Sequence, residues 1–220
     1  MASTSLIGRR PLLRGIAASA AAGLLGIASD GGAEVPGPGA SGRPRPTQAD
    51  WRVLRRHLDG ELLRPHGGGY ALAARLYDPR YDSVRPAAVV EAAHADDVST
   101  VLAFARRFGL PVRAKSGGHS YVGASTVRDG LVISTTALQA VRYDSGSRRV
   151  GVGAGARLID VHTALDRHGR TVPTGTCPTV GATGLTLGGG IGLESRAYGL
   201  TCDALQEAVV VTADGRRHTA

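Results

Sequence analysis

The sequence contains one lysine, Lys115, among 26 basic residues, and only 4% of its 220 residues are aromatic. A nucleic-acid-binding surface usually shows basic stretches interleaved with aromatic side chains, and the chain has no such stretch. The formal net charge of +8 is carried almost entirely by arginine. We attribute that charge to composition rather than to a binding patch, and we expect no nucleic-acid partner.

Several other patterns are missing. The 32 glycines follow no G-X-Y repeat, which excludes collagen. No P-loop occurs, and no spacing of residues indicates a metal site or a hydrolytic triad. The hydrophobic fraction of 42% and the charged fraction of 20% exclude a wholly disordered chain and a polytopic membrane protein. The composition therefore predicts a folded globular domain.

The first 33 residues are expected to be an export signal. Arg9 and Arg10 precede an apolar run at 15–28, which is too short and too weakly apolar for a comfortable membrane span. Paired arginines before such a run are typical of a twin-arginine signal peptide, which predicts a secreted protein without further membrane association. An ordinary Sec signal or an uncleaved anchor is the alternative. Residues 34–49 are rich in glycine and proline and predict a flexible linker, and we expect the folded domain to span 50–220.

The folded part alternates between helical and extended patterns. Trp51, Leu54, Leu58 and Leu62 share one helical face, which predicts a helix over 51–63. Further helices are expected at 96–108 and 157–168, and strands at 87–91, 110–113, 130–134, 139–143, 149–152 and 209–212. This order predicts an α+β domain.

Two segments carry the chemistry. In the first, SGGHSY at 116–121 follows a predicted strand, and its two glycines let successive backbone N–H groups point at one anion such as a pyrophosphate. Taken alone, the segment favours an ordinary strand–loop–strand corner with an exposed histidine. The second segment, 174–192, contains seven glycines and predicts a surface that a flat or charged ligand can approach closely. It is not a Rossmann motif, because no apolar strand immediately precedes the glycines.

Together, four motifs resemble the berberine-bridge-enzyme branch of the FAD-linked oxidoreductases, which have the vanillyl-alcohol-oxidase, or PCMH-type, FAD-binding domain. They are SGGHSY at 116–121, CPTVG at 177–181, LGGGIG at 187–192 and YGLTCD at 198–203. The resemblance covers roughly 50–220. It implies the first α/β subdomain and part of the second, with the chain ending before the substrate domain.

The resemblance implies FAD as the cofactor, attached covalently to His119 and Cys177. A neutral imidazole and a thiolate are both nucleophiles suited to such attachment. The alternatives are a structural histidine and a disulfide between Cys177 and Cys202. The cofactor-binding residues that we expect are Arg113, Ser116, Gly117, Gly118, His119, Ser120, Gly175, Cys177, Val180, Gly181, Gly184, Gly188, Gly189, Gly190, Gly192 and Val210.

The implied reaction is the two-electron oxidation of an alcohol, a sugar or a secondary-metabolite intermediate, with O2 reoxidising the flavin to give hydrogen peroxide. In the resembled family the residue at the position of Val180 faces the flavin, and valine there is typical of oxidases. Leu185 stands where many plant members have a histidine that stabilises the reduced flavin. The catalytic base is expected beyond Ala220, and the sequence does not predict the oligomeric state. The alternative is a non-catalytic module that binds FAD or a flat aromatic compound.

Overall fold

The computed structural model describes residues 43–220, so the predicted signal peptide and most of the predicted linker lie outside the described part. None of its helices is long and apolar enough to cross a membrane. The helices are α2 (Gln48–Arg56), α3 (Tyr70–Ala74), η2 (Pro79–Tyr81), α4 (Ala95–Phe108), α5 (Leu158–Asp166), α6 (Ala182–Leu187), α7 (Ser195–Tyr198) and η3 (Thr201–Ala204). The strands are β1 (Glu61–Leu63), β2 (Ala88–Glu91), β3 (Val112–Lys115), β4 (Leu131–Ser134), β5 (Val141–Asp144), β6 (Arg149–Val152), β7 (Val209–Val211) and β8 (Arg217–Thr219).

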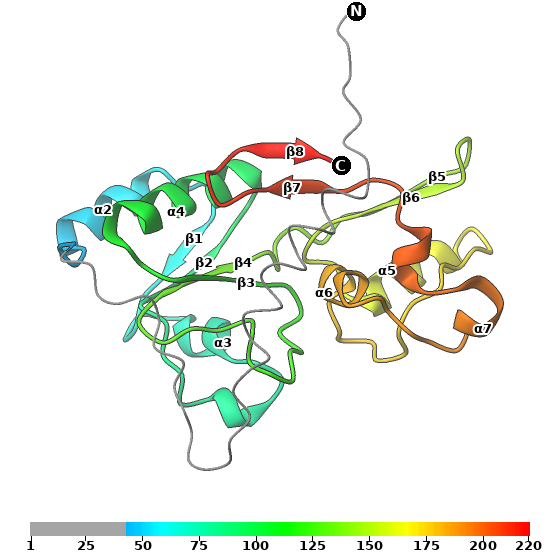
Figure 1. The fold of residues 1–220 in the computed structure, drawn as a ribbon, viewed down its shortest axis with the longest axis horizontal. Coiled ribbons are helices and arrows are strands. Elements are labelled where there is room, and N and C mark those ends of the chain that lie inside the picture. The colour runs from blue at the N-terminus through cyan, green and yellow to red at the C-terminus, as the bar shows by residue number, and fades with distance from the viewer. Residues whose placement is uncertain (1–42) are drawn as a thin grey trace, which may run out of the picture. The chain divides into compact units, whose positions relative to one another are not determined.

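A four-stranded sheet with the order β1-β2-β4-β3 forms the first subdomain (Figure 1). Strands β2, β4 and β3 run parallel, and β1 pairs antiparallel with β2. Because successive side chains of a strand point to opposite faces, Val90 packs under α2 and α4 while Val89 packs against α3. Both faces of the sheet are therefore covered, as expected for parallel strands.

The second part of the chain builds a smaller core. The hairpin β5–β6 packs with α5, and the buried residues of this cluster are Ala156, Leu158, Val161, Leu165 and Ala182. The hairpin β7–β8 lies instead beside α4 of the first subdomain, where the Ser99 hydroxyl donates to the Gly215 carbonyl at 2.8 Å. The mixture of a parallel sheet with separate hairpins confirms the predicted α+β class.

The prediction of one helix over 51–63 is wrong. Helix α2 begins at Gln48, with Thr47 as its N-cap, and ends at Arg56, and residues 61–63 form β1. The Asp59-Gly60 turn separates the two elements. A Cβ atom on Gly60 would lie 2.1 Å from the Glu91 carbonyl oxygen, so glycine is needed where the chain enters the sheet. Leu62 has helical spacing from Leu58, but it is buried as a strand residue.

The remaining predicted elements are present; the strand at 149–152 has the predicted bounds, and the others have shifted ends. The strand predicted at 110–113 is β3 at Val112–Lys115, so Lys115 ends the strand and the SGGHSY segment follows at once. Gly109 ends α4 in the left-handed conformation (φ 67°), which a residue with a side chain rarely adopts.

Candidate functional site

The loop after β3 presents several unpaired backbone donors. Within residues 43–220, the N–H groups of Gly117, Gly118 and His119 have no hydrogen-bond acceptor. Gly118 has a φ of 72°, and this left-handed turn lets neighbouring N–H groups converge. The Ser116 hydroxyl donates to the Ala154 carbonyl at 2.8 Å and fixes the start of the loop. The arrangement is suited to an anion such as a phosphate.

A second loop packs directly on the first. A Cβ atom on Gly117 would lie 2.3 Å from the backbone nitrogen of Gly181, and one on Gly181 would lie 2.4 Å from the nitrogen of Gly117. The two backbones therefore touch with no room for a side chain between them. Gly181 also forms an isolated antiparallel bridge with Arg157, at the start of α5. Glycine at both positions allows the two predicted motifs to meet.

This contact brings together the two predicted attachment residues. His119 Nε2 lies 3.0 Å from Thr179 Oγ1, and Thr179 Oγ1 lies 3.8 Å from Cys177 Sγ. Tyr77 stacks on His119 with ring centroids 4.0 Å apart and an interplanar angle of 19°. The backbone N–H of Tyr77 donates to the Gly118 carbonyl at 3.1 Å, which fixes this stack to the loop. Cys177 and Cys202 are both free thiols, so the alternative disulfide is not formed.

A cleft of about 450 Å³ opens beside these residues. Lys115 and Arg157 supply positive charge, and none of the residues that line the cleft is acidic. The Lys115 ammonium is buried and donates to the carbonyls of Ala73 and Arg75. Burial lowers the pKa of His119, which favours its neutral form. The lining residues are Tyr77, Lys115, Ser116, Gly117, His119, Thr136, Gln139, Gly155, Arg157 and Thr179.

Beside several glycines of the glycine-rich segment, other atoms of the protein occupy the space that a side chain would need. A Cβ atom added to Gly192 would lie 1.6 Å from the Thr174 carbonyl oxygen, and one added to Gly190 would lie 2.1 Å from Thr201 Oγ1. These glycines let the segment approach neighbouring backbone, whether or not they also contact a cofactor. Gly175 is similarly crowded, whereas a Cβ atom on Gly184 would meet no atom within 4 Å. A Cβ atom on Gly188 or Gly189 would make only ordinary van der Waals contacts, at 3.6 Å and 3.7 Å.

The other predicted binding residues lie in different settings. Arg113 is exposed on β3, and Val210 is 45% exposed on β7; neither lines the cleft. The Ser120 hydroxyl accepts from the Ala124 N–H at 3.0 Å and so stabilises a turn. Val180 is half-buried and packs against the core of the second part. The structure thus groups His119, Cys177 and the Ser116–Gly118 loop, and leaves Arg113 and Val210 outside this group.

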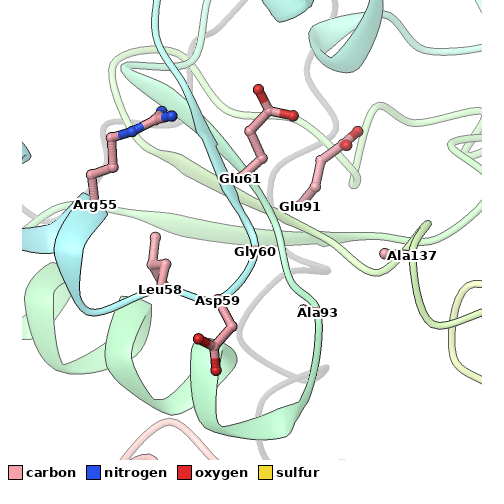
Figure 2. Close-up of a pocket in the computed structure, with 8 residues that line it drawn as sticks. All are labelled: Arg55, Leu58, Asp59, Gly60, Glu61, Glu91, Ala93 and Ala137. Atoms are coloured by element: carbon pink, nitrogen blue, oxygen red, sulfur yellow. The ribbon is translucent and has the colours of Figure 1, made fainter.

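A second cleft, of about 380 Å³, lies at the end of β1 (Figure 2). Glu61 and Glu91 are register partners on β1 and β2, so their carboxylates extend to the same side of the sheet. Arg55 of α2 brings a positive charge to the same cleft. No predicted motif contributes to it. Its lining residues are Arg55, Leu58, Asp59, Gly60, Glu61, Glu91, Ala93 and Ala137.

Asp97 stabilises the loops beside this second cleft. Its buried carboxylate accepts from the N–H groups of Asp59 and Gly60 at 3.0 Å and from that of Ala93 at 2.8 Å. Asp59, His94 and Asp97 lie within 4.8 Å of one another, but these backbone donors already occupy both oxygens of Asp97. The hydrogen bond to Asp59 raises the pKa of His94. This cluster therefore joins the loops around β1 and α4.

The fold and the cleft define a flavin-binding domain with an open anion-binding loop. A family model described as an FAD binding domain matches residues 86–220, and the chain belongs to this family of FAD-linked oxidoreductases, whose cofactor is FAD. The predicted cofactor and the predicted PCMH-type fold are thereby confirmed.

Individual relatives agree with this assignment. The chain is 37% identical over 147 residues to the FAD-linked oxidoreductase YgaK of Bacillus subtilis, covering 62% of this chain and 33% of YgaK. Berberine-bridge-enzyme-like 1 of the moss Physcomitrella patens superposes with a TM-score of 0.73 at 34% identity, covering 77% of this chain and 37% of the moss protein. The chain therefore spans about a third of the length of these relatives.

The grass pollen protein Phl p 4 is also similar, with a TM-score of 0.68 at 27% identity over 72% of this chain and 35% of Phl p 4. It is described as having glucose dehydrogenase activity. A variant of Phl p 4 with valine in place of an isoleucine is described as a glucose oxidase.

The described residues fit FAD. The unpaired N–H groups of the loop and the positive lining of the cleft suit its diphosphate, and His119 lines the same cleft. Sequence reasoning missed Tyr77 and Thr179, which contact His119 directly. Thr179 belongs to the quoted CPTVG motif, so its proximity to Cys177 was a usable signal. Nothing in the sequence indicated that Tyr77 would stack on a residue 42 positions later.

Proposed function

We propose that the protein is an exported FAD-dependent oxidase whose flavin is covalently attached to both His119 and Cys177. The observation that carries this proposal is that Thr179 joins the two side chains, at 3.0 Å from His119 Nε2 and 3.8 Å from Cys177 Sγ, beside the cleft that His119 and Thr179 line. They come from loops about 60 residues apart, and the exposed Cys177 thiol is free.

The residues of the chain have distinct tasks in this proposal. The loop at 116–119 holds the diphosphate with its N–H groups, and Arg157, which also lines the cleft, balances part of its negative charge. Burial lowers the pKa of the His119 imidazole and so favours the neutral form, which is the form that can act as a nucleophile. When bound, FAD supplies the acceptor for a hydride and the site that reacts with O2.

Val180 is proposed to keep a path open for O2. Its side chain is short, and it is held between Cys177 and α5: its N–H donates to the Cys177 carbonyl at 3.2 Å, and its carbonyl accepts from Leu158 at 3.0 Å. The valine variant of Phl p 4 that is described as a glucose oxidase supports the idea that a small side chain favours reaction with O2. We propose an alcohol, a sugar or a secondary-metabolite intermediate as the substrate, and a catalytic base beyond residue 220.

The test of attachment uses acid precipitation of the purified full-length protein, followed by absorption spectra of the pellet and the supernatant. We expect the flavin to stay with the wild-type pellet and with each of His119→Ala and Cys177→Ala, because one bond suffices to retain it. The double variant should release the flavin into the supernatant. Release from the wild type would contradict covalent attachment, and release from Cys177→Ala alone would show that His119 forms no bond.

A further inference from the structure

Thr179 lies between the two proposed attachment residues, His119 and Cys177, and has no task of its own in the proposed function. Its hydroxyl lies within hydrogen-bond distance of His119 Nε2, at 3.0 Å, and contacts Cys177 Sγ at 3.8 Å. The turn formed by the Cys177 carbonyl and the Val180 N–H, at 3.2 Å, holds Thr179 next to Cys177. Tyr77 stacks on the imidazole and restricts its rotation. The hydroxyl therefore lies on a continuous path from the thiol to the ring.

We propose that Thr179 is a positioning residue that connects the Cys177 thiol to the His119 ring as a proton relay, so that attachment at Cys177 follows attachment at His119. This inference rests on the proposed function, because it concerns the order in which the two bonds form. It assigns to Thr179 a task that neither a packing residue nor a surface threonine would have.

The order follows from the donors and acceptors of imidazole. A neutral ring carries one N–H and one bare nitrogen. When Nε2–H donates to Thr179 Oγ1, Nδ1 keeps its lone pair and is the nucleophile. Once Nδ1 is bonded to carbon and the Nε2 proton has left, Nε2 can only accept. The Thr179 O–H then donates to Nε2, and the Cys177 S–H donates to Thr179 Oγ1, which directs the thiol proton toward the ring.

The relay makes Cys177 a better nucleophile than it would be without Thr179, because the thiolate rather than the thiol reacts. In each attachment a C–H bond of the flavin and an N–H or S–H bond of the protein are replaced by one C–N or C–S bond. The two protons and two electrons released pass to O2, which becomes hydrogen peroxide. His119 thus acts first as a nucleophile and afterwards as the acceptor of the thiol proton.

The experiment adds FAD to full-length protein prepared without flavin, and measures by mass spectrometry the flavin carried by the His119 and Cys177 peptides over time. Thr179→Val keeps the branched shape and removes the hydroxyl, and Thr179→Ser is the matched control that retains it. We expect Thr179→Val to slow attachment at Cys177 by about a hundredfold or more at pH 7, the lower end of the range for loss of a positioned proton transfer, and to change attachment at His119 far less. Thr179→Ser should behave like the wild type.

A pH profile separates proton transfer from simple positioning. Without the relay, the thiol proton of Cys177 must pass to water, so the rate of attachment in Thr179→Val should rise more steeply with pH than the rate in the wild type. Equal rates in Thr179→Val and the wild type, or an equal loss at both sites with an unchanged pH profile, would overturn the relay. If Cys177 becomes attached at the wild-type rate in His119→Ala, the relay is also overturned, although the proposed double attachment of the wild type would still stand. A wild type without any covalent flavin would overturn both proposals.

Discussion

Replacing Gly117 by alanine tests whether the contact between the two loops builds the site. The new Cβ atom would lie 2.3 Å from the nitrogen of Gly181 and 3.0 Å from both its Cα atom and the Thr179 carbonyl oxygen. All three neighbours are backbone atoms, which cannot rotate away. Gly117 is not among the glycines with positive φ, so the effect is steric rather than conformational.

The expected cost lies at the upper end of the range for inserting a methyl group into a packed region, about 2–3 kcal/mol. For a chain of this length that free energy corresponds to a fall in Tm of roughly 4–12 °C. The loops must also separate, so FAD affinity should fall and attachment at both His119 and Cys177 should decrease together. Urea unfolding, thermal melting and titration with FAD measure the first three effects, and acid precipitation measures the attachment.

Gly184→Ala is the matched control. Gly184 lies in α6 with nothing within 4 Å of the added atom, and alanine favours a helix, so we expect a gain of about 0.5–1 kcal/mol. If Gly117→Ala unfolds within about 0.5 kcal/mol of the wild type and binds FAD equally well, the close contact between the two loops is not what forms the site. A loss of FAD affinity in Gly184→Ala at full stability would support the predicted role of Gly184 in binding the cofactor.

Three further predictions concern oxygen, pH and export. Val180→Leu should slow reoxidation of the reduced flavin by O2 about tenfold in stopped-flow measurements, or about 1.4 kcal/mol, and an unchanged rate with full flavin content would leave Val180 as a packing residue. Burial lowers the pKa of His119 below its ordinary value of 6.5. Between the two values the unfolded chain binds the proton more readily than the folded one, so both stability and attachment at His119 should decrease as the pH falls through this window; attachment that is constant across a pH titration would contradict a neutral nucleophile. Replacing Arg9 and Arg10 by lysine should abolish export through the twin-arginine route, which cell fractionation measures, and unchanged export would indicate the Sec route.

Local patterns predicted most of the fold. The helix of α4 and its glycine end were predicted because amphipathic spacing and a left-handed glycine are local properties. The helix over 51–63 was wrong because Leu58 and Leu62 have helical spacing by coincidence. The pairing of residues 61–63 with β2 is a long-range contact that the spacing does not report.

In the candidate site too, local motifs predicted the residues, but they did not predict the long-range contacts between them. The motifs identified His119 and Cys177, but their meeting depends on the contact between Gly117 and Gly181, which lie far apart in the chain. Gly190 and Gly192 were predicted as ligand-facing, whereas the structure shows them pressed against Thr201 and Thr174. A glycine permits close approach by any backbone or ligand, so the sequence does not distinguish the two. Their contact with FAD stays a prediction.

Mass spectrometry of the protease-digested holoprotein tests double attachment most directly. The account predicts one species in which a single flavin joins the peptide that contains His119 to the peptide that contains Cys177, with the mass of all three parts less the hydrogens lost in forming the two bonds. Recovery of both peptides without flavin, or of Cys177 in a disulfide with Cys202, would contradict it.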